Sequence, residues 1–288
     1  MRTPVKNLLG AIAFSLVGIP VALAADMPVK APVNAPVAAV YNWTGFYVGG
    51  AIGARRTDSD LSIGSIDELS FNNTFTQHDL PTCAQQPLRP CRTGASSGGT
   101  AFRVGSYVGF NWQFGERWVA GIEGDWAWAD NTTTNDGFKF FLGNPPPDSS
   151  FSVRTTWDAS ARGRLGYLVA PTVLLYGTGG AAWLKTDLTS NCGALSCFPG
   201  TYTPTVLNQS SIRSGWTVGA GVESMLAANW IVRAEYRYSD YGNASYTDVR
   251  PCTQQPGCNA GSSLNVGYDL ALKSHTATVG IAYKFGTP

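Results

Sequence analysis

The sequence predicts an all-β protein, an eight-stranded antiparallel transmembrane β-barrel, and three observations support this prediction. Residues Val279–Phe285 alternate apolar with small or polar side chains, a period of two that indicates a strand with one apolar face. The chain opens with two basic residues and an apolar run, as an export signal does. Between these ends, alternating segments are joined by long and short connections in turn, which is typical of a membrane barrel.

The composition is consistent with this class. The 288 residues include 33 Gly, 13 Phe, 12 Tyr and 9 Trp, with 44% hydrophobic and 14% charged residues. Such a mixture favours strands, tight turns and aromatic belts over helices, and it does not indicate disorder.

The N-terminus predicts a signal peptide over residues 1–24. Arg2 and Lys6 precede an apolar run from Leu8 to Leu23, and Ala22-Leu23-Ala24 supplies the small residues that a signal peptidase recognises. A membrane-anchoring helix is the alternative, but the run contains Gly18 and Pro20 and is shorter than the ~20 residues that a span needs.

The remaining chain is divided into a linker and a barrel. Prolines recur every four residues at Pro28, Pro32 and Pro36, so residues 25–42 are predicted to be a Pro-rich periplasmic linker. Without the signal, 18 basic residues face 19 acidic ones, and a net charge of −1 does not favour nucleic acid as a partner. Because no other long apolar run occurs, a membrane-embedded chain must form a barrel, predicted over residues 43–288.

Eight strands are expected in order, and their connections set the topology. Residues 55–100, 131–152, 187–211 and 243–267 are predicted as four long extracellular loops, and Gly115-Glu116, Ala170-Pro171 and Ala227-Ala228 as short periplasmic turns. The fifth segment has consecutive apolar residues at Leu174–Tyr176, so its faces are not assigned. The expected strands are Trp43–Ala54, Ala101–Phe114, Arg117–Asp130, Val153–Val169, Thr172–Thr186, Ile212–Leu226, Asn229–Gly242 and a last strand that ends at Phe285.

Aromatic residues on the apolar faces predict two girdles at the level of the lipid headgroups. A sugar-stacking surface is the alternative, but it would need these rings in loops, and they lie mostly in strands. The residues are Trp112, Trp118, Trp126, Trp128, Trp157, Tyr167, Trp216, Trp230, Tyr236, Tyr238, Tyr283 and Phe285.

Three stretches carry a resemblance to a known family. They are Tyr41–Gly50 (Y-N-W-T-G-F-Y-V-G-G), Arg162–Tyr167 (R-G-R-L-G-Y) and His275–Phe285 (H-T-A-T-V-G-I-A-Y-K-F). Together with the signal and the linker they resemble the small porin-family outer membrane immunogenic proteins, which have an OmpA/OmpX-like eight-stranded barrel. The resemblance implies the cell outer membrane as location and outer-membrane lipids as partners. It also implies Tyr283 and Phe285 as an assembly signal for the barrel assembly machinery. The cysteines and the long first loop depart from the family pattern, so functions carried by the loops stay open.

Six cysteines fall as one pair in each of three long loops. In an oxidising compartment, disulfides between neighbours in one loop are the expectation. A metal site is the alternative, but no Cys-x-x-Cys occurs and the only histidines, His78 and His275, are far from the pairs in sequence, so no metal and no cofactor is expected. The candidate pairs are Cys83 with Cys91, Cys192 with Cys197, and Cys252 with Cys258.

Ten charged residues lie on the predicted inward faces, five of each sign. Because an eight-stranded barrel is just wide enough for its own side chains, these groups are expected to meet in the lumen as a salt-bridge network. A selectivity ring or gated pore is the alternative, but the equal number of signs favours a plug. The residues are Arg103, Glu123, Asp125, Asp158, Arg162, Arg164, Glu223, Arg233, Glu235 and Arg237.

No catalytic residue is predicted, and the protein is not expected to be an enzyme. Ser274 and His275 are neighbours along a strand and therefore point to opposite faces, and no Gly-x-Ser-x-Gly elbow is present. The sequence thus predicts a monomeric outer-membrane barrel with a structural and surface-presenting role. A small porin-like channel for ions or small solutes is one alternative, and loops that bind a host molecule or small ligand are another.

Overall fold

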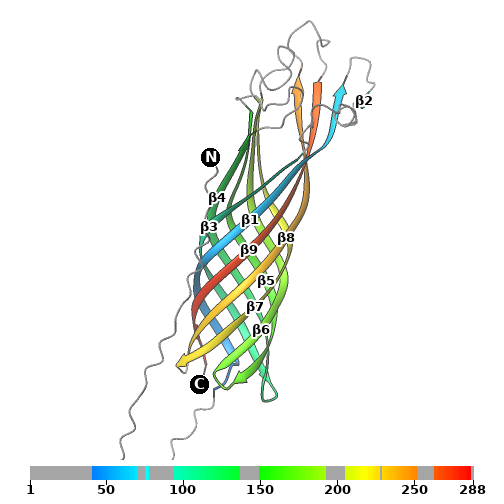
Figure 1. Ribbon diagram of the computed structural model, residues 1–288. Helices are drawn as coiled ribbons and strands as arrows, with labels where there is room; N and C mark the ends of the chain where they lie inside the picture. Colours follow the sequence, from blue (N-terminus) through cyan, green and yellow to red (C-terminus); the bar gives the residue numbers. More distant parts are fainter. Residues whose placement is uncertain are drawn as a thin grey trace, which may run out of the picture. The chain divides into compact units, whose positions relative to one another are not determined.

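Eight long strands form a closed antiparallel ring in the computed structural model, which describes residues 41–69, 75–77, 94–136, 149–192, 205–227, 229–251 and 263–286. Each strand pairs with the next in sequence, and β9 pairs back with β1 (Figure 1). A short strand, β2 (Phe75–Gln77), adds to the edge of β1. The expected all-β, eight-stranded barrel is confirmed. The strands of the ring are β1 (Gly45–Leu69), β3 (Gly94–Phe114), β4 (Trp118–Asp136), β5 (Ser149–Ala170), β6 (Val173–Cys192), β7 (Thr205–Ala227), β8 (Trp230–Pro251) and β9 (Ser263–Lys284).

Three short connections gather at one end of the barrel, which is called the turn end below; the opposite end is called the loop end. Residues 115–117 join β3 to β4, and Gly115 adopts the positive φ of 60° that a tight hairpin turn requires. Residues 171–172 join β5 to β6, and residues 228–229 join β7 to β8. In the described residues, no helix is long and apolar enough to cross a membrane.

Near the turn end the wall is apolar outside and polar or small inside. Phe46, Val48 and Ile52 on β1 are exposed on the outer face, whereas Tyr47 between them is buried. The same alternation holds on β9, where Val279 and Ile281 point outward. The fifth predicted segment, left unassigned above, places Leu174 and Tyr176 inside and Leu175 outside, so it is apolar on both faces. The outer surface of this part of the barrel is therefore suited to lipid.

The predicted limits of the loops were wrong, because every strand continues toward the loop end beyond the apolar band. The strands have 19 to 25 residues, whereas ~9–11 suffice to cross a membrane. In the extensions of β1 and β9 the faces are reversed: Leu61, Leu270 and Leu272 are buried inside, and Lys273 is exposed outside. Water surrounds a wall of this kind, because its apolar side chains turn away from the exterior.

The extensions form two four-stranded sheets rather than a closed ring. The β3–β4 ladder stops at Val104–Trp128 and the β7–β8 ladder at Trp216–Asp240, while the other neighbours stay paired almost to their ends. One sheet therefore contains β3, β1, β9 and β8, and the other contains β4, β5, β6 and β7. Their inner faces share an apolar core, called the loop-end cluster. It consists of Leu61, Phe151, Val153, Ala182, Leu184, Leu188, Tyr241, Tyr268, Leu270 and Leu272.

Candidate functional site in the barrel lumen

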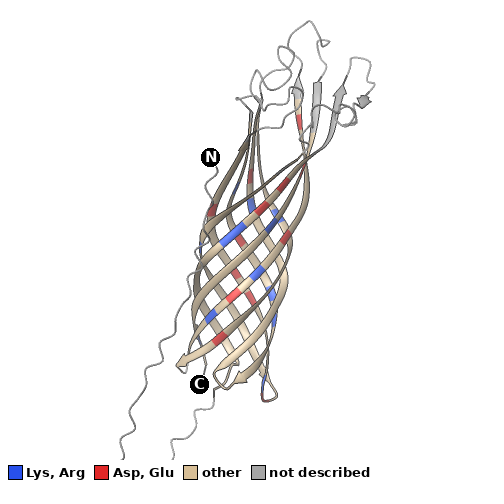
Figure 2. Cartoon of the chain, in the orientation of Figure 1, with Lys and Arg blue, Asp and Glu red and all other residues tan. Residues whose placement is uncertain are grey.

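The middle of the lumen holds charged side chains from six of the eight strands, and Figure 2 shows segments of opposite charge next to one another across the barrel. On the side of the loop end, Asp158 pairs with Arg103 at 2.7 Å and with Arg237 at 3.2 Å. Asp125 pairs with the same two arginines at 2.6 and 2.8 Å. Asp125 also accepts a hydrogen bond from the Ser160 hydroxyl. Two carboxylates and two guanidiniums thus form a closed square.

On the side of the turn end, Glu123 and Glu223 share the guanidinium of Arg233, with both contacts at 2.6 Å. Arg164 pairs with Glu223 at 2.8 Å and approaches Glu123 at 3.5 Å. All four side chains are at most 4% exposed. Charges buried so deeply are stable only when paired, because desolvation costs several kcal/mol per ion.

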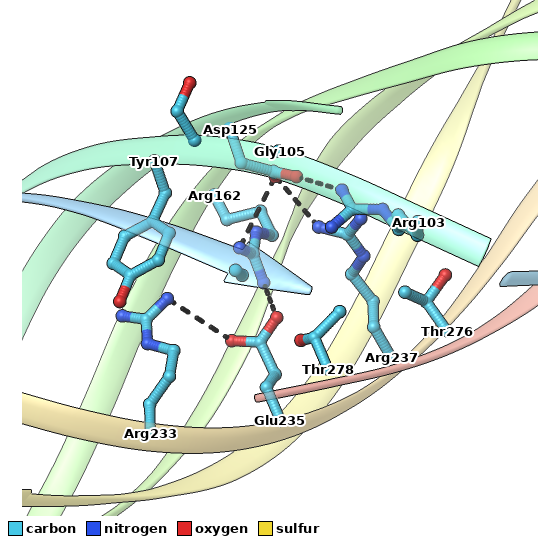
Figure 3. A pocket seen from close by; sticks show the side chains of 12 residues that line it. Arg103, Gly105, Tyr107, Asp125, Arg162, Arg233, Glu235, Arg237, Thr276 and Thr278 are labelled. Carbon is cyan, nitrogen blue, oxygen red and sulfur yellow. Dashed lines mark hydrogen bonds and ion pairs between the residues drawn. The ribbon is translucent and has the colours of Figure 1, made fainter. Parts of the chain in front are cut away.

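Arg162 joins the two groups. Its guanidinium contacts Glu123 at 2.6 Å, Glu235 at 2.7 Å and Asp125 at 3.4 Å. Figure 3 shows Arg162 between Asp125 and Glu235, with Arg103, Arg233 and Arg237 pointing toward the same centre. The structure thus brings all ten residues singled out in the sequence into one chain of ion pairs.

One member of the network was missed by the sequence reasoning, which assigned Arg55 to the first loop. Arg55 is fully buried and pairs with Asp158 at 2.7 Å. Its other terminal nitrogen donates to the backbone carbonyl of Ala129 at 2.5 Å and to the Thr155 hydroxyl at 2.8 Å. Ala129 and Thr155 lie at the bulges where β4 and β5 leave regular pairing. Arg55 therefore satisfies groups at the level where the ring opens into two sheets.

Three buried tyrosines, also missed, separate and orient the arginines. The Arg233 guanidinium lies 4.0 Å from the ring centre of Tyr107, and that of Arg164 lies 4.1 Å from that of Tyr176. The Tyr47 hydroxyl donates to Glu123 at 2.7 Å and accepts from Arg164 at 2.8 Å. Cation–π contacts of this kind become stronger when water is excluded.

The sequence carries a signal for these tyrosines. A Cβ at Gly109 would overlap the ring of Tyr47, and a Cβ at Gly49 would overlap that of Tyr107. Each of these glycines lies opposite an inward tyrosine on the neighbouring strand in the register. An inward tyrosine facing an inward glycine therefore indicates a ring that lies across the lumen.

Little free space is left inside the network. The cavity lined by Arg103, Tyr107, Arg162, Arg233 and Glu235 has a volume of about 10 Å³, room for about one water molecule. With Arg55 included, six guanidiniums face five carboxylates within the part of the lumen described here.

The turn end is closed by a second apolar cluster, called the turn-end cluster, with Trp43 at its centre. The Trp43 indole N–H donates to the carbonyl of Pro171 at 3.2 Å, and its backbone N–H donates to the Gln113 side chain at 2.9 Å. The segment that enters β1 is thereby tied to the turn between β5 and β6 and to the end of β3. The cluster consists of Trp43, Tyr47, Ala51, Tyr107, Val119, Leu168, Leu174, Tyr176, Met225, Ile231 and Ala282.

The other predicted sites are placed as follows. Ser274 is buried inside the barrel, whereas His275 lies on the outer face, where its Nδ1 is 2.7 Å from the Tyr236 hydroxyl. Tyr283 on β9 and Phe285, the residue directly after this strand, lie on the outer face with ring centres 5.2 Å apart. Several predicted features lie outside the described residues: the signal peptide, the linker up to residue 40, His78 and the cysteine pairs. The exception is Cys192, whose backbone is described at the end of β6.

The predicted girdle aromatics all lie on the outer wall, in two groups. Near the turn end are Trp112, Trp118, Tyr167, Trp230, Tyr283 and Phe285; toward the loop end are Trp126, Trp128, Trp157, Trp216, Tyr236 and Tyr238. Two aromatic levels with an apolar band between them are typical of barrels that span a bilayer.

A closed eight-stranded ring with an apolar exterior, two aromatic levels and a charged interior defines an integral outer-membrane barrel. The chain belongs to the outer membrane protein beta-barrel domain family, whose model matches residues 31–285. It is therefore a protein of the cell outer membrane.

Named relatives are consistent with this assignment. The chain is 27% identical to the 31 kDa outer-membrane immunogenic protein of Brucella melitensis over 267 residues, which cover 92% of this chain and 93% of the relative. It is 28% identical to the 25 kDa outer-membrane immunogenic protein of Brucella abortus over 259 residues, covering 90% and 85%. Among solved structures, the outer membrane protease OmpT from Escherichia coli matches with 10% identity and a TM-score of 0.48, covering 85% of this chain and 98% of that one. That similarity is too distant to bear on activity.

Proposed function

We propose that this protein is a closed structural barrel that holds long loops at the cell surface and does not act as a general pore. The observation that carries the proposal is the succession of three filled layers along the lumen. The turn-end cluster lies first, the ion-pair network second and the loop-end cluster third. An aqueous path would have to pass all three.

A porin-like channel is the competing function, and the lumen gives it little support. The arginines that would line a pore are at most 6% exposed, and each has a carboxylate within 4.0 Å. A water-filled lumen would leave such groups hydrated, whereas here they contact one another. The near balance of charge also favours packing over ion selectivity.

The surface-presenting role follows from the orientation proposed for the barrel. In outer-membrane barrels, short turns face the periplasm and long loops face the exterior. The extended strands then raise the loops above the headgroups on a rigid base, and relatives carry the word immunogenic in their names. A second candidate role of these loops is to bind a host molecule or a small ligand. It would be tested by a pull-down with a variant lacking residues 70–93.

The partners proposed are those of a monomeric barrel. Outer-membrane lipids would contact the apolar band, and the barrel assembly machinery would recognise the last strand with Tyr283 and Phe285 on its outer face. No enzymatic role is proposed, because Ser274 and His275 lie on opposite sides of the wall.

Liposome swelling tests the closed lumen directly. Proteoliposomes containing the refolded protein are placed in an iso-osmotic solution of L-arabinose, and the swelling rate is compared with that of empty liposomes and of liposomes with a general porin. The closed barrel predicts the rate of empty liposomes. A rate near that of the porin, lowered by charge reversal at Arg162 or Glu235, would overturn the proposal.

A further inference from the structure

Residues 41–44 cross the turn end before β1 begins, and they are called the strap below. The central side chain of the strap, Trp43, is fully buried in the turn-end cluster. Tyr41 packs against the same cluster and is only partly buried. None of the four residues belongs to a strand. The strap therefore closes the lumen at the turn end without being part of the wall.

The strap is attached to the barrel through side chains. Trp43 donates through its backbone N–H to the Gln113 side chain and through its indole to the Pro171 carbonyl. The Thr44 hydroxyl accepts from the backbone N–H of Gln113 at 3.0 Å, and the Thr44 carbonyl accepts from Nζ of Lys284 at 3.5 Å. Among the described residues, no backbone–backbone hydrogen bond joins the strap to the barrel.

The three turns at the same end are attached differently. Each turn accepts a backbone hydrogen bond from a strand farther along the chain, so it can move only together with the wall. The strap can leave without breaking any such bond. The donor and acceptor residues are Leu168 with Arg117, Met225 with Thr172 and Lys284 with Asn229, at 2.8, 2.9 and 2.7 Å.

Gly45 connects the strap to β1 and is suited to be a hinge. Its φ of 145° is a backbone conformation that favours glycine. A Cβ at this position would also overlap the carbonyl oxygen of Phe285. The chain can therefore turn here from the wall into the lumen, and no side chain obstructs the turn.

A buried amide without a partner lies farther into the lumen than the strap. Asn111 is the next inward residue after Gln113 on β3, and it is fully buried. Neither its amide nitrogen nor its amide oxygen has a hydrogen-bond partner among the residues that the structure describes. An unpaired buried amide costs free energy, because it has lost its water. Moving the strap away would admit water to this amide and remove that cost.

We propose that the strap opens and closes while the eight-stranded ring stays folded, and that the buried amide of Asn111 favours the open position. Burial of the Trp43 indole favours the closed position, so two opposing contributions set the balance. Opening exposes the base of the lumen on the side from which the N-terminal segment enters. This inference goes beyond the proposed function, and it holds whether or not ions pass the ion-pair network.

Hydrogen exchange of the refolded protein in detergent micelles, followed by NMR, tests the proposal. The probes are the backbone and indole N–H of Trp43, and the reference is the backbone N–H of Leu168. After correction for intrinsic rates, the Trp43 protons are expected to exchange about a hundredfold faster than that of Leu168. Asn111→Leu replaces the amide by an apolar group of similar size. It is expected to slow exchange at Trp43 about tenfold, because the closed strap then covers no unpaired amide.

Asn131→Leu is the matched control, because it makes the same chemical change on β4 near the loop end, and exchange at Trp43 is expected to equal that of the wild type. Each variant is first shown to be folded by its heat-dependent migration in gels. Exchange at Trp43 as slow as at Leu168 would overturn the proposal, because the strap would then open only with the wall. So would faster exchange in Asn111→Leu than in the wild type, or equal rates in Asn111→Leu and the control.

Discussion

Replacing Glu123 by Gln removes a carboxylate of the lumen that contacts three arginines. Glu123 contacts Arg233 and Arg162 at 2.6 Å and Arg164 at 3.5 Å, and it accepts a hydrogen bond from Tyr47 at 2.7 Å. The amide keeps the shape of the side chain but not its charge. Three guanidiniums would then face a neutral group in a lumen where arginines already outnumber carboxylates.

The magnitude follows from these contacts. Unit charges about 4 Å apart attract by about 4 kcal/mol at an effective dielectric constant of about 20, so three guanidiniums contribute about 12 kcal/mol in gross terms. Much of this offsets the cost of burying the carboxylate, which is several kcal/mol. Because the substitution leaves the arginines buried without their partner, the free energy of unfolding is expected to fall by about 3–5 kcal/mol.

Urea unfolding in detergent micelles, followed by tryptophan fluorescence, measures this change. Asp130→Asn is the control, since it also removes one carboxylate from an arginine pair, but from an exposed one that solvent screens. The control is expected to unfold at the urea concentration of the wild type. If Glu123→Gln behaves like Asp130→Asn, the ion pairs do not hold the lumen together and the reasoning is wrong.

Three further predictions concern the wall. Arg55→Met leaves the Ala129 carbonyl unsatisfied and should lower the free energy of unfolding by about 2 kcal/mol, whereas Arg56→Met, on the outer face, should not change it in the same urea titration. Gly53→Ala places a Cβ against the carbonyl oxygen of Ala277 and should prevent refolding, as judged by gel migration. Gly50→Ala should refold normally, because its Cβ would lie 3.8 Å from the nearest atom, the carbonyl oxygen of Gly105. Leu272→Asp buries a charge in the loop-end cluster and should lower the free energy of unfolding by about 3 kcal/mol or more. The adjacent Ala271→Asp faces outward and should change this free energy by no more than about 0.5 kcal/mol. Equal effects of the two substitutions would refute the reversal of faces.

The sequence predicted the number, order and faces of the strands where lipid surrounds them, because a membrane imposes a strict alternation. It did not predict their length. The segment from Tyr268 to Thr276 is apolar at Leu270 and Leu272, one residue out of phase with Val279 and Ile281. That change of phase marks the level at which water replaces lipid outside the wall, and it was visible in the sequence.

The lumen was predicted in part for a related reason. Charged residues between outward apolar ones could be assigned to the interior, so ten of the eleven buried charges in the network were found. Arg55 was missed because it follows the last outward apolar residue of β1 in the membrane band. Tyr176 and both apolar clusters were missed because apolar residues on the inner face look like breaks in the pattern, as at Leu174–Tyr176. Tyr47 and Tyr107 alternate regularly with the outward residues, but only charged residues were considered for the interior.

Single-channel recording in planar bilayers tests most directly whether side chains fill the lumen from end to end. The purified wild-type barrel, inserted in symmetric KCl, is expected to give no stable conductance steps, with a general porin as positive control. Stable steps that scale with KCl concentration, and that change size when Arg162 or Glu235 is reversed in charge, would contradict the account.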